Sequence, residues 1–375
     1  MHCPENRRTG HAGFSLVELL VAMALVLIIT GGALTALTNA YRSSDSARIV
    51  TGVNNNLRIG IDLIVRDFIQ VGQGLPTGRT VQVPSFTGAL QIQRPHPQGS
   101  TCTAWPAGTQ SIPAVTPGPA CGPTIEGVAT DMVPTLAVDS VLDTVPVQSF
   151  NVNAHTATVS TPAQAVAGKD ISAGTADDIR VGDLLMFTKG SLSAMVYVTA
   201  VDGTQTVTFA TGDPMNLNQF HAAPDDAGTV DDLANTAPTT AQSANVSRIR
   251  MITYYLDSTI DPTTPRLIRH LGWGDPLAAV NQRGRTVAFS IETLQFSYDM
   301  LDGVTNPSNV RMVAADLTTA GQCAPNACSP NLIRKVNVFI AGRSDDPFST
   351  TKKLFRNSLN TQVSLRSLAL VDRYR

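Results

Sequence analysis

Charged residues are scarce in this chain and neither sign predominates: 15% of its 375 residues are charged, with 27 Lys and Arg against 29 Asp and Glu. A formal net charge of −2 argues against a nucleic-acid binder, which usually carries a basic stripe. The chain also lacks a G-x-S-x-G elbow, an H-E-x-x-H pair and a Walker glycine loop. We therefore predict no enzyme, no cofactor and no nucleic-acid partner. Low charge together with 28 Gly and 23 Pro favours a loop-rich β protein outside the cytoplasm.

A long apolar run covers residues 14–37 and contains a single charge, Glu18. At a rise of about 1.5 Å per residue, a helix of this length covers the ~30 Å hydrocarbon core of a membrane. Arg7 and Arg8 precede the run and should stay on the cytoplasmic side. A secretory signal peptide would place its cleavage site after the apolar run. A lipoprotein would need a cysteine there, whereas Cys3 lies before it.

The acidic residue in this run needs an explanation that a plain membrane anchor does not give. A carboxylate at the centre of a membrane helix costs about 2.5–3.5 kcal/mol, so Glu18 is expected to have a partner. If the chain is cut after Gly13, Phe14 becomes the N-terminus and carries an α-amino charge. In an assembly of parallel helices, Glu18 of one subunit would neutralise this amine on a neighbour.

The segment Gly13-Phe14-Ser15-Leu16-Val17-Glu18-Leu19-Leu20, followed by an apolar helix, resembles the class III leader of type IV prepilins and type II secretion pseudopilins. The resemblance implies that residues 1–13 are a leader peptide and that a membrane prepilin peptidase cuts after Gly13. The same peptidase would N-methylate Phe14, and Glu18 would be the fifth-position glutamate of the family. A simple anchor without processing is the alternative.

The helix is expected to continue beyond the membrane, because apolar residues recur at steps of three and four. These residues are Val50, Val53, Leu57, Ile61, Ile64, Phe68 and Val71. The polar positions between them are assigned to Arg42, Asp45, Arg48, Arg58, Asp62, Arg66 and Asp67. Gly and Pro in residues 72–76 end the pattern. We therefore expect a membrane and filament-core helix at 14–37, an amphipathic helix at 38–72 and a periplasmic head at 73–375.

Glycines interrupt both halves of this helix. Gly31-Gly32 favours either close packing between helices or a point that unwinds when subunits enter a filament, and both hypotheses stay open. Gly52 and Gly60 should soften the second half, at about 1 kcal/mol each relative to Ala.

The head is predicted to be an antiparallel β-sheet domain with long loops, so that the fold class is α+β and pilin-like. The expected strands are residues 80–83, 89–93, 140–145, 183–188, 194–201, 204–210, 248–256, 266–271, 286–300, 332–341 and 361–370. Asp202-Gly203 predicts a hairpin turn between 194–201 and 204–210, and Asp302-Gly303 marks another turn. Residues 94–124 are interpreted as a stapled surface loop, and 211–247 as an irregular stretch.

After removal of Cys3 with the leader, four cysteines remain on the oxidising side of the membrane. We favour the sequence-local pairs Cys102–Cys121 and Cys323–Cys328 over a zinc site, because paired C-x-x-C spacing is missing. The histidines of the mature chain are scattered and are interpreted as surface or loop residues: His96, His155, His221 and His270. The acidic residues Asp225, Asp226, Asp231 and Asp232 lack EF-hand spacing, so a solvated loop is preferred over a calcium site.

The C-terminal third resembles a second, related family. Its motifs are Tyr254-Tyr255-Leu256-Asp257, Leu267-Ile268-Arg269, Leu294-Gln295-Phe296-Ser297-Tyr298, the run 336–340 and Val363-Ser364-Leu365-Arg366. They are similar to the C-terminal half of PilW-type minor pilins, which are related to the J-type pseudopilin of type II secretion. This resemblance implies a structural minor pilin that primes type IV pilus assembly, with twitching motility, adhesion or DNA uptake as outputs.

Its implied partners are prepilin peptidase, other minor and major pilins, the inner-membrane assembly platform and the inner membrane itself. It would sit in the bacterial inner membrane with its head in the periplasm, and later at the cell surface in a pilus. The alternatives are a type II secretion pseudopilin and, more remotely, a membrane-tethered periplasmic enzyme or binding module.

Overall fold

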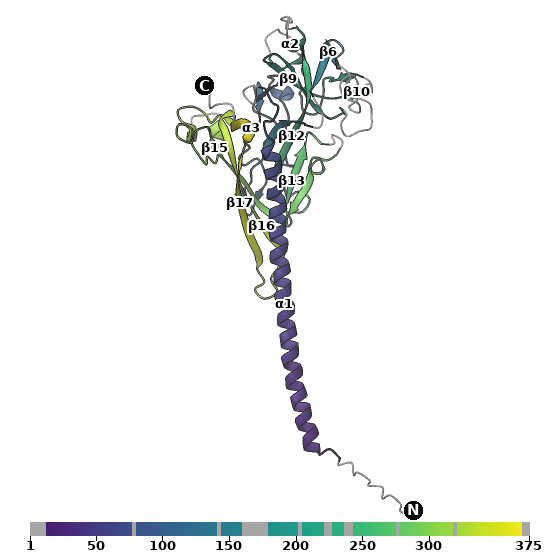
Figure 1. Cartoon of the computed structure of the whole chain (residues 1–375), viewed down its shortest axis with the longest axis vertical. Coiled ribbons are helices and arrows are strands. Elements are labelled where there is room, and N and C mark those ends of the chain that lie inside the picture. Colours follow the sequence, from purple (N-terminus) through teal and green to yellow (C-terminus); the bar gives the residue numbers. More distant parts are fainter. Residues whose placement is uncertain are drawn as a thin grey trace, which may run out of the picture.

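A computed structural model of the chain has an α-helical stem that projects from a β-rich head (Figure 1). The structure describes residues 13–76, 80–140, 144–159, 179–201, 205–220, 227–235, 243–274, 278–317 and 321–369. A long helix followed by antiparallel sheets is an α+β fold, so the predicted fold class is confirmed.

The stem and the centre of the head are one continuous helix, α1 (Leu16–Ile69), of 54 residues and about 81 Å. Its N-terminal half is exposed along its whole length, and burial begins at Ile49. The predicted apolar stripe is confirmed from Val53 onward, but Ile49 rather than Val50 is the first buried position. The assignment of Asp67 to a polar, wet position is wrong, because Asp67 is 4% exposed.

The larger sheet, built by ten strands among the described residues, lies on one side of the buried half of α1. Its central strand β12 (Asn245–Asp257) pairs antiparallel with four others: β5 (Val133–Val138), β6 (Val145–Asn151), β8 (Leu184–Lys189) and β13 (Arg266–Leu271). The remaining strands are β7 (Thr156–Val159), β9 (Leu192–Tyr197), β10 (Ala200–Val201), β11 (Thr206–Thr208) and β14 (Arg285–Phe289). Strand β14 borders α1.

The second sheet packs on α1 and contains β15 (Ile291–Met300), β16 (Ile333–Pro347) and β17 (Leu354–Ser364). The β16–β17 hairpin extends down along the helix toward the stem (Figure 1). Apolar residues alternate along β15 as expected for a sheet with one buried face, and the buried set is Leu294, Phe296, Tyr298 and Met300. A short helix, α3 (Arg366–Ala369), follows the sheet, so the predicted strand at 361–370 ends earlier than expected.

The chain passes from the first sheet to the second at Ser290, where the predicted single strand 286–300 is divided. Ser290 has a positive φ of 56°, which is uncommon for a non-glycine residue. Its carbonyl accepts the backbone N–H of Arg343 at 2.9 Å, and its hydroxyl donates to Asp345. A Cβ on Gly342 would lie 2.8 Å from the Ser290 carbonyl oxygen, so glycine is required for this close approach.

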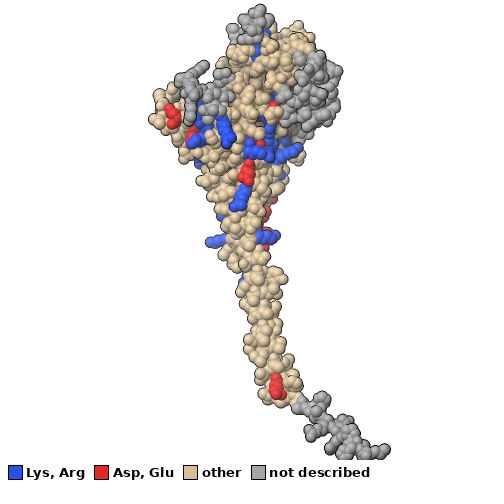
Figure 2. All heavy atoms as spheres, in the orientation of Figure 1, with Lys and Arg blue, Asp and Glu red and all other residues tan. Residues whose placement is uncertain are grey.

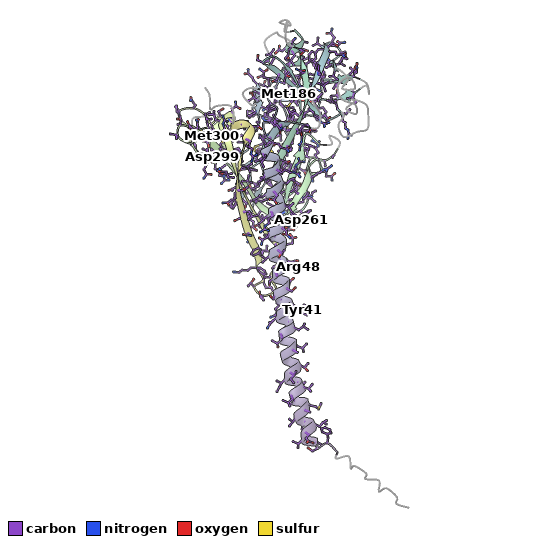
Figure 3. All side chains as sticks on the ribbon, viewed as in Figure 1. Tyr41, Arg48, Met186, Asp261, Asp299 and Met300 are labelled. Carbon is purple, nitrogen blue, oxygen red and sulfur yellow. A yellow bond between two sulfur atoms is a disulfide. The ribbon has the colours of Figure 1, made fainter. Side chains whose placement is uncertain are left out.

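The described residues of the head form two large apolar cores and a small third cluster around Cys121, Met132, Tyr255 and Ile268. The largest core surrounds the buried half of α1, with Leu57, Ile64 and Phe68, and also draws residues from both sheets, such as Leu136 and Phe296. The second core lies between β8, β9 and the short helix α2 (Val230–Asn235), with Phe187 among its members. Strands β8 and β9 face both cores, so side chains on both of their faces are buried. Figure 3 places Met186 of β8 high in the head.

The predicted strand at residues 89–93 is wrong. These residues begin as a 3-10 turn, η1 (Gly88–Leu90), because Gly88 takes a positive φ, and Gln93 makes an isolated bridge with Ala104. Of the predicted strand 140–145, residues 141–143 fall outside the described residues, and Val145 is the first residue of β6.

The predicted hairpin between 194–201 and 204–210 is found only for β10 and β11, because β9 pairs with β8. Its turn, Asp202-Gly203, falls outside the described residues. The Asp302 carboxylate accepts backbone N–H groups of residues 304–306, which gives the turn that Asp302-Gly303 predicts.

Both sequence-local disulfides are present, Cys102–Cys121 and Cys323–Cys328. The loop that the first one closes is only partly a surface loop. It buries Trp105 and Ile112, and β2 (Ser111–Pro113) pairs with β1 (Thr80–Gln82). A small hairpin, β3 (Thr124–Ile125) and β4 (Val128–Ala129), follows.

Candidate functional site

The predicted processing residues lie at the free end of the stem. Gly13 and Phe14 precede the helix, both are exposed, and the Phe14 side chain is 86% exposed. Ser15, the N-cap residue, has an extended backbone with φ −75° and ψ 146°. The peptide bond between Gly13 and Phe14 therefore lies outside the helical hydrogen-bond ladder, where a protease can reach it. Residues 1–12 of the leader lie outside the described residues.

A reciprocal capping box holds Ser15 and Glu18 together. The Glu18 N–H donates to Ser15 Oγ at 3.2 Å, and the Ser15 N–H donates to Glu18 Oε2 at 3.0 Å. This pair satisfies two of the donors that a helix start leaves open. Glu18 therefore has a partner within its own chain, which the sequence interpretation overlooked. The S-x-x-E spacing ahead of an apolar run was the signal that could have shown it.

The apolar side chains of the stem have no cover from their own head. Fourteen large apolar side chains of residues 14–37 are exposed, with Leu27 at 72% and Ile28 at 71%. Burying each is worth about 1.5–3 kcal/mol, so leaving them in water would forgo roughly 20 kcal/mol or more. This exceeds the usual net stability of a domain, about 5–15 kcal/mol. The stem must therefore be covered by a membrane or by other helices.

The polar groups of the stem suit an apolar surrounding. Thr30, Thr35 and Thr38 donate their hydroxyls to carbonyls one turn back, at 2.7 to 2.9 Å. These hydroxyls need no hydrogen bond from water, which the core of a membrane does not supply. Residues 19–41 carry no charge, and Figure 2 shows the stem uncoloured except for an acidic patch near its N-terminal end. Among the described residues, one helix, α1, is long and apolar enough to cross a membrane.

The border between stem and head lies between Tyr41 and Arg48 (Figure 3). Tyr41 is 67% exposed, whereas Ile49 is buried. Arg48 pairs with Asp45 on the helix at 3.2 Å, and it lies 4.0 Å from Asp346 near the tip of the β16–β17 hairpin. These exposed ion pairs contribute little to stability. They mark the level at which the head begins to cover the helix.

A buried carboxylate joins the C-terminal end of α1 to the larger sheet. Asp67 Oδ2 accepts the Tyr254 hydroxyl at 2.6 Å and Arg269 Nε at 2.6 Å. Arg269 Nη2 also donates to Asp67 Oδ1 at 3.3 Å. Burial, and then the nearby carboxylate, raise the pKa of Tyr254, so its hydroxyl stays protonated and donates. This trio, which we call the Asp67 clamp, fixes the C-terminal end of α1 to β12 and β13.

A second ionic cluster ties the small hairpin to the second sheet. Glu292 of β15 is 7% exposed and accepts Arg343 Nη1 at 2.7 Å and Arg356 Nε at 2.9 Å. Glu126, in the turn between β3 and β4, bonds the same two arginines at 2.8 Å. The cluster therefore locks β15, β16 and β17 against residues from a distant part of the chain.

The described histidines contact other side chains or the backbone. The expectation that each is a surface or loop residue is wrong for His270. His270 is 1% exposed, with Nδ1 3.1 Å from the Tyr255 hydroxyl and Nε2 2.8 Å from the Trp273 carbonyl. Burial lowers its pKa to about 4. His155 packs on Phe220 with ring centroids 3.5 Å apart, and His96 lies in a loop.

Only some of the acidic residues of 211–247 lie in the described part of the chain. Asp231 and Asp232 lie in the first turn of α2, while Asp225, Asp226 and His221 fall outside the described residues. In the described part of the chain, no group of three or more His, Cys, Asp or Glu side chains is arranged to hold a metal ion. Asp213 is buried in the same stretch and accepts backbone N–H groups of Met215, Leu217 and Asn218. Its role is to shape that loop.

Comparison with known families gives a match to the prokaryotic N-terminal methylation motif over residues 8–34. The matched segment contains Gly13, Phe14 and Glu18 and most of the exposed part of the stem. It supports a type IV pilin-like or pseudopilin protein, and it implies processing by a prepilin peptidase and association with pilins. Neither curated proteins nor solved structures gave a match.

Proposed function

We propose that this chain is a structural minor pilin of the PilW type, which takes part in the assembly and priming of a type IV pilus. Residues 1–13 are the leader, which prepilin peptidase removes before it N-methylates Phe14. Residues 14–37 then anchor the chain in the inner membrane, residues 38–72 carry the helix into the head, and residues 73–375 form the periplasmic head.

The observation that carries this proposal is the contrast between the two halves of α1. The same helix is fully exposed and apolar over its first half and packed into the head core from Ile49 onward. An anchor for a tethered domain needs only a flexible link after the membrane. A continuous helix held by the Asp67 clamp instead transmits the position of the stem to the head, as a subunit stacked in a filament requires.

In the filament, the apolar stem would pack among parallel helices of neighbouring pilins, where Gly31 and Gly32 allow close contact. A Cβ at either glycine meets nothing within 4 Å, so both present an open surface to a neighbour. Glu18 would neutralise the α-amino group of Phe14 on an adjacent subunit. Within the described chain, Oε2 of Glu18 accepts the neutral Ser15 N–H at 3.0 Å, so the amine of a neighbour would be a charged partner that its own chain does not supply.

Three variants separate charge pairing from helix capping. Glu18→Gln keeps an acceptor for the capping box and removes the charge, because Gln also serves at this position. Glu18→Leu removes both, and Ser15→Ala removes the cap while keeping the charge. We expect incorporation into sheared surface filaments to be lost in both Glu18 variants and kept in Ser15→Ala. Normal incorporation of Glu18→Gln would leave capping as the only role of Glu18 and refute the pairing.

Mass spectrometry of the same filaments tests the processing step. The expected N-terminal peptide begins at N-methylated Phe14. A functional protein that retains Met1 would contradict the proposal, because the α-amino charge would then lie far from Glu18. Replacing Gly13 by a larger residue should block cleavage and leave the full-length chain in the membrane.

The alternative proposal is a type II secretion pseudopilin, since the motif match supports both groups equally. A deletion strain distinguishes them: loss of surface pili and twitching favours the pilus, whereas loss of secreted enzymes favours the pseudopilus. A membrane-tethered enzyme or binding module is a more remote alternative, and catalytic activity of the purified chain would support it. Adhesion and DNA uptake are outputs that the same strain can report.

A further inference from the structure

A cavity of about 690 Å³ opens between the two disulfide-closed parts of the head. One wall comes from the segment around Cys102–Cys121, with Arg94, Trp105 and Thr116. The other comes from residues that flank the Cys323–Cys328 loop, including Leu317 and Pro330. A cavity of this volume suits a small molecule. No residue of α1 lines this cavity, so what it binds does not depend on the proposed function.

A buried cation lies in the wall of this cavity without a carboxylate partner. Arg94 is 6% exposed, and its Nε donates to the Cys102 carbonyl at 2.9 Å while Nη2 donates to Cys121 Sγ at 3.4 Å. Both partners are uncharged. Among the described residues, no acceptor bonds Nη1 and no Asp or Glu lines the cavity. Burial lowers the pKa of Arg94 to about 10, so the side chain remains charged at neutral pH.

Two further buried polar groups at the same cavity have no partner within the described part of the head. Trp105 is 2% exposed and its Nε1 donor makes no hydrogen bond, and the hydroxyl of Thr116, 8% exposed, also makes none. Buried polar groups are nearly always hydrogen-bonded, so each unsatisfied one needs an explanation. Both atoms have an accessible area below 1 Å², so they lie behind the cavity surface, and Arg94 is the residue of the three whose free N–H groups a ligand would meet.

We infer that the cavity binds the carboxylate of a small organic acid with an apolar body. The free N–H groups of the Arg94 guanidinium match the two oxygens of a carboxylate. The apolar body would lie against Trp105 and the surrounding prolines, which are Pro106, Pro113, Pro117, Pro119 and Pro330. A single negative charge matches one buried cation, whereas a phosphate dianion would remain half unpaired among apolar walls.

The test uses the full chain in detergent micelles and NMR titration with acetate, benzoate and indole-3-acetate. Each acid is compared with its neutral amide, which has the same shape without the charge. We expect benzoate or indole-3-acetate to bind one to one at millimolar concentration or tighter, and at least tenfold more tightly than the amide. Acetate, which lacks the apolar body, should bind most weakly of the three acids.

Two variants place the binding in this cavity. Arg94→Gln should weaken binding at least tenfold, whereas Arg58→Gln changes the net charge equally at an exposed position of α1 and should leave it unchanged. If Arg94→Gln fails to fold, Arg94→Lys keeps the charge, removes the planar guanidinium and should weaken binding severalfold. Equal binding of acid and amide, no binding of any acid, or an unchanged affinity in Arg94→Lys and Arg94→Gln overturns the inference. Tighter binding of inorganic phosphate than of every carboxylate also overturns it.

Discussion

Replacing Asp67 by Asn removes one negative charge from the contact between the C-terminal end of α1 and the larger sheet, while nearly preserving the size of the side chain. In the native head, this carboxylate accepts two hydrogen bonds of 2.6 Å, from Tyr254 and Arg269. Tyr254 is fully buried, and Asp67 is 4% exposed. Water therefore cannot replace the bond to Tyr254, and the Arg269 guanidinium loses its counter-ion.

The expected cost follows from these contacts. Breaking a buried ion pair by removing one partner typically costs about 3–5 kcal/mol. Asn retains one carbonyl acceptor, and Arg269 is partly open to solvent, with an exposed side-chain fraction of 18%. Both features reduce the loss, so we expect Asp67→Asn to lower the free energy of unfolding by about 3 kcal/mol.

The measurement is urea unfolding of the full chain in micelles, with Asp62→Asn as the control. Asp62 lies on the same helix and is exposed, so its substitution should change stability by no more than about 0.5 kcal/mol. A double-mutant cycle with Tyr254→Phe should give a coupling of roughly 1–2 kcal/mol. Equal, small effects of the two Asn variants, or no coupling to Tyr254, would refute the clamp as a link between the C-terminal end of α1 and the larger sheet.

Three further predictions concern the head and the helix. Burial lowers the pKa of His270 to about 4 from its ordinary 6.5. Between pH 6.5 and pH 4, His270 is therefore protonated in the unfolded chain but mostly neutral in the folded chain. The free energy of unfolding should fall by about 3 kcal/mol when the pH is lowered from above 6.5 to 4. His270→Gln should flatten this slope in urea unfolding at a series of pH values. Gly60→Leu should destabilise the head by about 1–3 kcal/mol, because a Cβ there already lies 3.0 Å from a Leu267 methyl. Gly52→Leu, with open space around it, should instead be neutral or raise the melting temperature. Replacing both Cys102 and Cys121 by Ser should cost about 3 kcal/mol and lower the melting temperature in a thermal scan, and an unchanged melting temperature would show that packing alone holds the loop.

The local patterns of the chain predicted the helix and much of the sheet well. An uninterrupted apolar run followed by a 3–4 stripe favours one long helix, so α1 was predicted within two residues at its start and three at its end. Strands such as β13 and β16 carry strong β-branched and alternating patterns, and they were found. An error fell at 89–93, where the pattern is short and Gly88 takes a positive φ. Ser290 divided a predicted strand because its positive φ serves a contact with another part of the chain.

The sequence by itself determined the contrast between the two parts of α1. Charge is absent from residues 19–41, and a one-sided apolar stripe follows. Both are properties of neighbours on one helix, and they need no other part of the chain. Only the tertiary structure decided that Asp67 is buried rather than wet, since its partners Tyr254 and Arg269 lie 187 and 202 residues away in sequence. It likewise decided that Arg94, Trp105 and Thr116 surround one cavity. Pairings over such separations depend on how the sheets and loops pack, and no periodicity in the chain encodes them.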